Sequence, residues 1–224
     1  LGERHMRRVR VKICGITRLE DIYTSIKAGA DSLGFIVNVP ESPRNITLNW
    51  AKRLIRETPI FVTRVAVTVF RDLEQTLEIY RELRPDAIQL HGGLPTLEGV
   101  EEISRRVRVI GTVKALEGWS MEDMTHYINH LDAVLVDSHV PGMYGGTGVA
   151  HDWSISRRIR DTIYPKPMIL AGGLKPDNVR EAILTVEPFA VDVSSGVEAQ
   201  PGIKDAKKII SFIEEVRRAE ECLS

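Results

Sequence analysis

Cysteine and long apolar segments are the scarcest features of this chain. Only Cys14 and Cys222 are present among 224 residues, which excludes a disulfide framework, and neither belongs to a Cys-x-x-Cys pair. No apolar run approaches the roughly 20 residues that cross a bilayer. The first residues, LGERHMRRVR, lack the apolar segment of a signal peptide. We therefore expect a protein of the reducing cytoplasm with no membrane partner.

An excess of charge of one sign is also missing. The 30 Lys and Arg residues are offset by 31 Asp and Glu residues, which leaves a formal net charge of −1. The basic stretches RRVR and SRRIR contain no aromatic residues on which bases would stack, so no nucleic-acid partner is expected. The histidines show no HExxH-type spacing. We therefore predict no metal site.

What the chain does contain is one unit, a short apolar strand followed by an amphipathic helix, repeated eight times. The strands are rich in Val and Ile and lack polar alternation, as in parallel strands that helices cover on the outside. The predicted strands are 8–14, 32–37, 61–69, 87–90, 107–115, 133–137, 167–171 and 189–194, and the predicted helices are 18–30, 48–57, 73–83, 96–106, 120–131, 153–163, 178–186 and 205–218.

Eight such units in a chain of this length predict an α/β fold, a single (β/α)8 TIM barrel spanning residues 1–224. A doubly wound open sheet is the alternative. In a barrel, the chemistry is carried at the carboxyl ends of the strands and in the loops that follow them. The residues at those ends are therefore the candidates for a site.

Glycine and serine gather after the last two predicted strands. Loops at these positions of a barrel often bind phosphate through backbone N–H groups, because glycine lets the phosphate oxygens come close. We therefore predict a phosphorylated small-molecule ligand, although tight turns alone would also use such residues. The candidates are Gly172 and Gly173 in AGGLKPDNV, and Ser194, Ser195 and Gly196 in DVSSGVEAQPG.

Asp137 closes the apolar strand 133–137. Burial would raise the pKa of this carboxyl above its ordinary value and would let it act as a general acid. The alternative is an ion pair with Lys114, at the end of the preceding strand.

Cys14 ends the first strand, and the two-residue period of a strand places Lys12 on the same face. A nearby ammonium lowers the pKa of a thiol, so Cys14 is a candidate nucleophile or base. The alternative is an inert thiol in the core.

Three further polar residues stand near strand ends. Arg44 lies in the loop ESPRN, where a guanidinium would bind a carboxylate through two parallel hydrogen bonds, although most loop arginines are simply solvated. Gln89 and His91 end the fourth strand in IQLHGG and are predicted to line the pocket. For a lone histidine, a structural role is the alternative.

Taken together, these motifs resemble one family, phosphoribosylanthranilate isomerase of tryptophan biosynthesis. The similarity runs from the first strand to the last, and the combination of KICGIT with DVSSGVE is specific. The matching stretches are VKICGIT, SPR, IQLHG, VLVD, GGTG followed by DWS, AGGLKPDNV, AVDVSSGVE and PGIKD.

The resemblance implies an Amadori rearrangement of N-(5-phosphoribosyl)anthranilate to 1-(2-carboxyphenylamino)-1-deoxyribulose 5-phosphate, without cofactor or metal. Asp137 matches the general acid that protonates the ribose ring oxygen, and Cys14 matches the general base that removes the C2 proton. Arg44 matches the residue that holds the anthranilate carboxylate, and the two late loops match the phosphate site. Asp192 matches a position near the substrate. A monomer or a homodimer is expected.

The chain departs from the commonest family pattern in VNVPESPRN, the loop after the second strand. The resemblance also leaves open whether a related aminoaldose of the histidine pathway is isomerised. Other phosphate-binding barrels are rivals: a metal-dependent sugar-phosphate epimerase would need clustered His and Asp ligands, and indole-3-glycerol-phosphate synthase would use glutamate and lysine at strand ends. A further rival is a catalytically inactive barrel that only binds a ligand or a partner.

Overall fold

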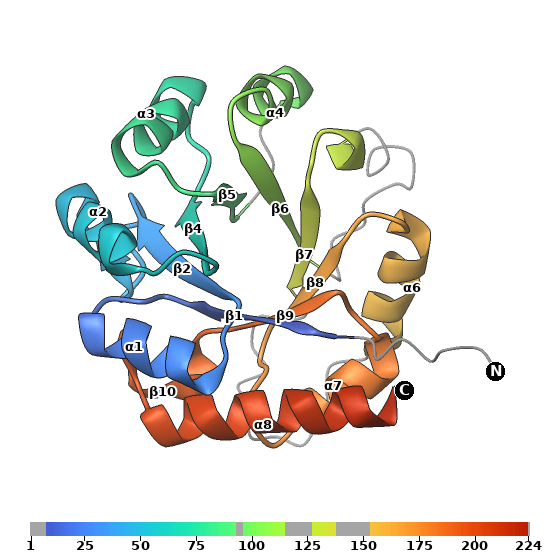
Figure 1. Ribbon diagram of the computed structural model, residues 1–224. Helices are drawn as coiled ribbons and strands as arrows, with labels where there is room; N and C mark the ends of the chain where they lie inside the picture. The colour runs from blue at the N-terminus through green and yellow to red at the C-terminus, as the bar shows by residue number, and fades with distance from the viewer. Residues whose placement is uncertain (1–7, 93–95, 115–126, 138–152, 224) are drawn as a thin grey trace.

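The computed structural model describes residues 8–92, 96–114, 127–137 and 153–223. Within them, eight parallel strands form a closed ring in the order β1-β9-β8-β7-β6-β5-β4-β2, and β2 pairs with β1 to close it (Figure 1). The predicted barrel is therefore confirmed, and the open-sheet alternative is wrong. The ring strands are β1 Arg10–Cys14, β2 Ser32–Val37, β4 Thr63–Thr68, β5 Ala87–Leu90, β6 Arg108–Lys114, β7 Ala133–Asp137, β8 Met168–Ala171 and β9 Ala190–Val193.

Helices surround the ring (Figure 1). They are α1 Leu19–Ala28, α2 Leu48–Glu57, α3 Leu73–Leu83, α4 Leu97–Ser104, α6 Trp153–Ile163, α7 Val179–Val186 and α8 Ala206–Cys222. The predicted helix 120–131 falls mostly outside the described residues, and its positions 127–129 are helical. Three short pieces extend the barrel after β2 and β9: β3 Asn45–Ile46, the 3₁₀ turn η1 Ser195–Val197, and the hairpin of β10 Glu198–Gln200 with β11 Ile203–Lys204.

Local signals set the helix ends. The side chains of Thr47 and Asp72 accept hydrogen bonds from the backbone N–H groups of Trp50 and Gln75, which caps the first turns of α2 and α3. Helix α1 stops at Gly29, whose φ of 106° is a conformation that glycine adopts without steric cost.

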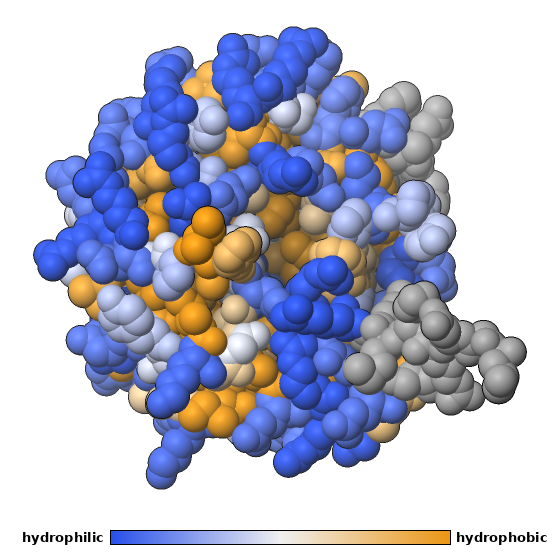
Figure 2. Space-filling view, viewed as in Figure 1, coloured by the Kyte–Doolittle hydropathy of each residue, from blue (hydrophilic) through white to orange (hydrophobic). Residues whose placement is uncertain are grey.

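The apolar side chains form two layers. The larger layer lies between the ring and the helices and contains fully buried residues such as Phe35 of β2 and Phe212 of α8. On the face seen in Figure 2, hydrophilic residues cover much of the periphery, and apolar residues show between them and beside the central hollow. The smaller layer fills the barrel interior and contains Cys14 together with Val65, Val67, Ala87, Ile110, Leu135, Ile169, Ala171 and Ala190.

The register of β1 places its residues between the second strand and the last. Lys12 lies opposite Ser32 of β2 and opposite Asp192 of β9, while Cys14 lies opposite Gly34 of β2. Because side chains alternate along a strand, Lys12 and Cys14 share one face, and Cys14 belongs to the interior layer. Among the described residues, no helix combines the length and the apolar character needed to cross a bilayer.

Candidate active site

Cys14 and Asp137 lie at the same end of the barrel. Each is the last residue of its strand, β1 and β7, and parallel strands present their carboxyl ends at one mouth. In the ring, β9 and β8 stand between these two strands. The thiol of Cys14 and the carboxylate of Asp137 thus belong to separate strands around one opening.

The thiol of Cys14 is buried, with 6% of the residue exposed. Gly34 of the neighbouring strand leaves room for it: a Cβ atom at that position would lie 2.8 Å from Cys14 Sγ and 3.1 Å from Lys12 Nζ. The ammonium of Lys12 donates a hydrogen bond to Asp192 Oδ1 at 2.8 Å, and both side chains are buried. The sulfur and the Lys12–Asp192 ion pair therefore share one small space inside the barrel.

In these surroundings the pKa of Cys14 differs from the expected one. Burial raises the pKa of the thiol above its ordinary value, and Asp192 raises it further; the positive charges of Lys12 and Lys204 lower it without reversing the effect. Lys12 lowers the pKa of Cys14, as predicted, but the expectation of a pKa below the ordinary value is wrong, because burial outweighs the lysine. Burial alone would lower the pKa of Lys12, but Asp192 and Cys14 outweigh burial and raise it, so the lysine stays charged.

Asp137 is half-buried at the end of β7. In the strand register it lies opposite Lys114 of β6 and opposite Ala171 of β8. The side chain of Lys114 and the loop 138–152 fall outside the described residues. The general-acid role and the alternative ion pair with Lys114 both remain predictions.

Arg44 lies in the loop after β2, immediately before β3, and is not a solvated loop arginine. Its Nε donates to Glu198 Oε1 at 2.7 Å and its Nη2 donates to Glu198 Oε2 at 2.6 Å. The side chain of Arg44 is 19% exposed and that of Glu198 is 4% exposed. The hydrogen bonds to Glu198 raise the pKa of Arg44 above its ordinary value.

The two predicted phosphate loops touch each other. Gly172 and Gly173, after β8, have φ angles of 91° and 66°, which favour glycine. A Cβ atom at Gly196 would lie only 1.9 Å from the carbonyl oxygen of Leu174, so only glycine fits where the loop after β9 passes this backbone. Ser195 is exposed and Ser194 is partly buried. The candidate phosphate residues thus come together on one side of the mouth.

Gln89 and His91 have different surroundings. Gln89 of β5 is buried, and its Nε2 lies 3.5 Å from Thr112 Oγ1, whereas its Oε1 accepts no hydrogen bond from the described part of the chain. His91 follows β5 and is exposed, and its backbone N–H donates to the carbonyl oxygen of Thr68. Within the described ranges, Gln89 therefore offers an unused acceptor, while the hydrogen bond of His91 is made by its backbone.

Glu198 and Lys204 were not among the site residues predicted from the strand ends. Both are buried, and Lys204 Nζ lies 3.0 Å from Glu198 Oε1. They belong to the hairpin β10–β11, which lies outside the repeated strand–helix unit. The motifs SSGVE and PGIKD contain these residues, and a charged residue in each of two short matching stretches was the available signal. Within the described ranges, no cluster of three or more His, Cys, Asp and Glu residues has an arrangement that would hold a metal.

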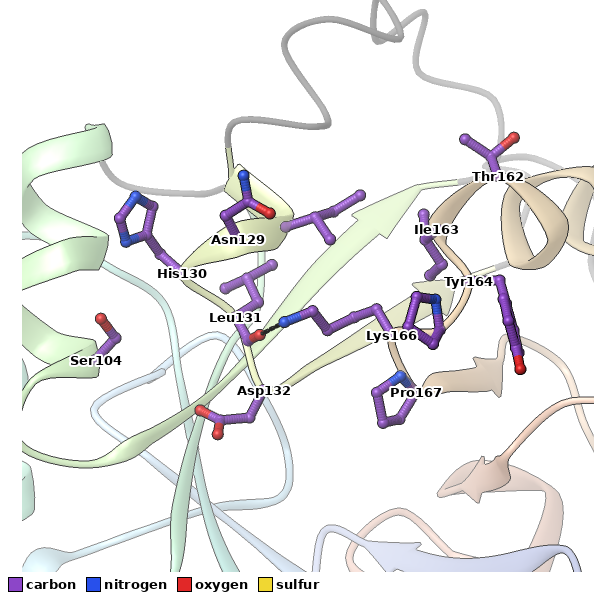
Figure 3. Close-up of a pocket in the computed structure, with 12 residues that line it drawn as sticks. Ser104, Asn129, His130, Leu131, Asp132, Thr162, Ile163, Tyr164, Lys166 and Pro167 are labelled. Carbon is purple, nitrogen blue, oxygen red and sulfur yellow. Dashed lines mark hydrogen bonds between the residues drawn. The ribbon is translucent and has the colours of Figure 1, made fainter.

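A cavity of about 750 Å³ lies at the opposite end of the barrel. Its lining comes from residues 128–132, before β7, and 162–167, before β8, together with Ser104 (Figure 3). Lys166 crosses it and donates a hydrogen bond to the carbonyl oxygen of Leu131 at 2.5 Å (Figure 3). Because this is the amino end of the strands, the cavity is separate from the mouth that carries Cys14 and Asp137.

A closed barrel with acid–base groups and paired glycine loops at one mouth is typical of enzymes that act on phosphorylated small molecules. The family model described as N-(5'phosphoribosyl)anthranilate (PRA) isomerase matches residues 11–215. The chain belongs to this family. The family expected from the sequence motifs is thereby confirmed, and assignment to the two rival barrel families is wrong.

Curated relatives and solved structures agree. An N-(5'-phosphoribosyl)anthranilate isomerase of Methanosarcina mazei is 42% identical, covering 95% of this chain and 96% of the relative. That of Methanothrix thermoacetophila is 44% identical, covering 93% and 98%. The crystal structure of the isomerase from Thermotoga maritima is 43% identical, covers 94% of this chain and 99% of that one, and has a TM-score of 0.81. Another solved isomerase, with 40% identity and a TM-score of 0.77, contains reduced 1-(o-carboxyphenylamino)-1-deoxyribulose 5-phosphate.

Proposed function

We propose that this protein converts N-(5'-phosphoribosyl)anthranilate into 1-(2-carboxyphenylamino)-1-deoxyribulose 5-phosphate, a step of tryptophan biosynthesis, with Asp137 as general acid and Cys14 as general base. The observation that carries the proposal is the position of these two residues at the carboxyl ends of β7 and β1, on one mouth beside the paired loops after β8 and β9. The related structure that contains a reduced product analogue supports the choice of substrate.

The first proton transfer opens the sugar ring. Asp137 donates its proton to the ring oxygen, the bond between this oxygen and C1 breaks, and the lone pair of the anthranilate nitrogen forms a C1=N⁺ iminium. The half-buried position of Asp137 lets it reach a substrate in the mouth. General acid catalysis of this kind contributes roughly 10²–10⁴-fold to the rate.

The second transfer takes the C2 proton. The thiolate of Cys14 removes it, the C–H electrons form a C1=C2 double bond, and the iminium electrons return to nitrogen, which gives an enolamine that tautomerises to the ketone. Burial raises the pKa of Cys14, so its thiolate is scarcer than that of an exposed cysteine and is also the stronger base. Lys12, buried beside the sulfur, stabilises the thiolate once it forms.

The phosphate and the carboxylate of the substrate need separate binding groups on the protein. We assign the phosphate to the backbone of Gly172, Gly173 and the segment 194–196, where the two loops converge. We assign the anthranilate carboxylate to Arg44. The two hydrogen bonds from Arg44 to Glu198 use Nε and Nη2. Nη1 has no hydrogen-bond partner among the described residues.

Three residues complete the proposed site. Gln89 Oε1, which accepts no hydrogen bond from any described residue, lies inside the barrel and suits a sugar hydroxyl. Asp192, which accepts a hydrogen bond from Lys12, lies close to the thiol; burial raises the pKa of Cys14 and Asp192 raises it further. His91, exposed after β5, is assigned to the rim of the pocket.

The proposal includes a chemistry without cofactor or metal and a cytoplasmic setting, which suits a free catalytic thiol. Assembly as a monomer or a homodimer remains a prediction; one solved relative is described as monomers of a dimeric isomerase. The direct test is to mix the purified protein with N-(5'-phosphoribosyl)anthranilate in the presence of EDTA and follow loss of substrate. Turnover that Cys14→Ala and Asp137→Asn abolish is expected, and no turnover by the unmodified chain would contradict the proposal.

A further inference from the structure

Two buried charged groups have no part in the proton transfers. The side chains of Glu198 and Lys204, 4% and 1% exposed, lie directly behind Arg44. Glu198 Oε1 accepts hydrogen bonds from Lys204 Nζ at 3.0 Å and from the backbone N–H of Gly202 at 3.3 Å, in addition to its bonds from Arg44. A carboxylate held by so many donors has one fixed orientation.

Stability alone does not account for the charges of this cluster. A buried ion pair contributes little to stability compared with apolar residues of the same size, so such a cluster is weak evidence of a stabilising function. Burial raises the pKa of Glu198, but Arg44 and Lys204 outweigh burial, and the net pKa lies below the ordinary value. The carboxylate therefore stays ionised beside Arg44 and Lys204. Burial lowers the pKa of Lys204, and Glu198 opposes that effect.

The geometry controls where Arg44 can donate. A guanidinium is planar and rigid, so two hydrogen bonds along one edge fix the direction of all its remaining N–H groups. Glu198 holds the Nε and Nη2 edge. The free Nη1 is thereby aimed by Glu198 rather than by the flexible stem of Arg44.

Lys204 connects this arrangement with the phosphate loop. Its Nζ donates to the carbonyl oxygen of Ser194 at 3.1 Å and lies 3.5 Å from Ser194 Oγ. A Cβ atom at Gly15 would lie 2.6 Å from Arg44 Cδ and 3.0 Å from Ser194 Oγ, so Arg44 and Ser194 both pack against the same glycine. Lys204 thus bonds both to Glu198 and to the loop after β9.

We propose that Glu198, held by Lys204, is a positioning residue that aims Arg44 Nη1 at the carboxylate of the substrate. The proposal rests on the carboxylate-binding role given to Arg44 above. Glu198 itself does not touch the substrate, and its effect is confined to substrates that carry the carboxylate.

The test compares two substrates, N-(5'-phosphoribosyl)anthranilate and its analogue lacking the carboxylate, N-(5'-phosphoribosyl)aniline. Glu198→Gln keeps the shape of the side chain and removes its charge. We expect this variant to raise KM about tenfold for the carboxylated substrate, with kcat little changed, because one charge-assisted contact loses its alignment. For the aniline analogue, KM of Glu198→Gln and of the unmodified protein should be equal.

A double-mutant cycle separates positioning from structure. Arg44→Ala should raise KM for the carboxylated substrate alone, and adding Glu198→Gln to it should cause no further rise. Equal rises of KM for both substrates in Glu198→Gln, or a normal KM while Arg44→Ala is impaired, would overturn the positioning role. If Arg44→Ala has the same KM as the unmodified protein for both substrates, Arg44 does not bind the carboxylate, and this proposal is wrong as well.

Glu198→Asp provides a second route if Glu198→Gln does not fold. The shorter side chain keeps its charge but withdraws the carboxylate from Arg44 by one methylene. We expect a smaller rise of KM, again only for the carboxylated substrate. An unchanged KM in a folded Glu198→Asp protein would contradict the proposal.

Discussion

Lys12 Nζ and Asp192 Oδ1 lie 2.8 Å apart, opposite one another in the register of β1 and β9, and this buried ion pair adjoins the sulfur of Cys14. The pair leaves the thiol without the full effect of the lysine charge. Asp192 raises the pKa of Cys14 and Lys12 lowers it, so each acts on the proposed base in an opposite direction.

The first prediction concerns the pH dependence of turnover. Cys14 must lose its proton to act as a base, and its pKa is raised, so kcat/KM should increase with pH toward the alkaline side. Asp192→Asn removes a negative charge that raises the pKa of the thiol, and the rising limb should therefore move to lower pH. Lys12→Met should move it to higher pH. The midpoints of the two kcat/KM profiles are the measurement, and shifts in the same direction would contradict this account.

The second prediction separates the two cysteines. Cys14→Ala and Asp137→Asn should each lower kcat by about 10²–10⁴-fold, since each removes a proton transfer. Cys222→Ala is the matched control, because this thiol is exposed at the end of α8 and does not belong to a strand of the ring. It should retain normal kcat. Near-normal turnover in Cys14→Ala would refute the base assignment.

The third prediction tests the phosphate loops. Gly196→Ala should separate the loop after β9 from Leu174, because the added Cβ would lie 1.9 Å from the carbonyl oxygen of that residue. We expect KM for the substrate to rise at least about tenfold, with weaker inhibition by inorganic phosphate. Gly92→Ala is the control, since it also adds a methyl group to a glycine of a loop, at a φ of 83° that disfavours alanine, but in the loop after β5. Equal effects of the two variants on phosphate inhibition would argue against this site.

The fourth prediction concerns stability in acid. The pKa of Glu198 is lower in the folded chain than the ordinary glutamate value of about 4.3, so its contribution is present above that value and is lost as pH falls through the folded pKa. The Tm difference between the unmodified protein and Glu198→Gln should therefore be large at pH 7 and shrink toward pH 3. Asp86, whose pKa Arg64 also lowers, is more exposed, and Asp86→Asn should show a smaller effect. A difference for Glu198→Gln that does not depend on pH would contradict the prediction.

The repeated apolar periodicity was enough to predict the barrel, because each strand and helix is specified by its own short segment. Cys14 and Asp137 followed from the same rule, since each ends its strand. The register between β1 and β9 was not predictable, and without it the effect of Asp192 on the thiol was missed. Glu198 was missed for a related reason: its partner Arg44 is distant in the sequence and belongs to a different loop.

The pairing of β1 with β9 joins the beginning of the barrel to its end. During synthesis, Cys14 is made long before Asp192, the residue opposite Lys12 that raises the pKa of the thiol. A growing chain therefore holds an incomplete catalytic apparatus until the ring shuts. We therefore expect the electrostatic surroundings of Cys14 to be complete only once β9 has paired with β1.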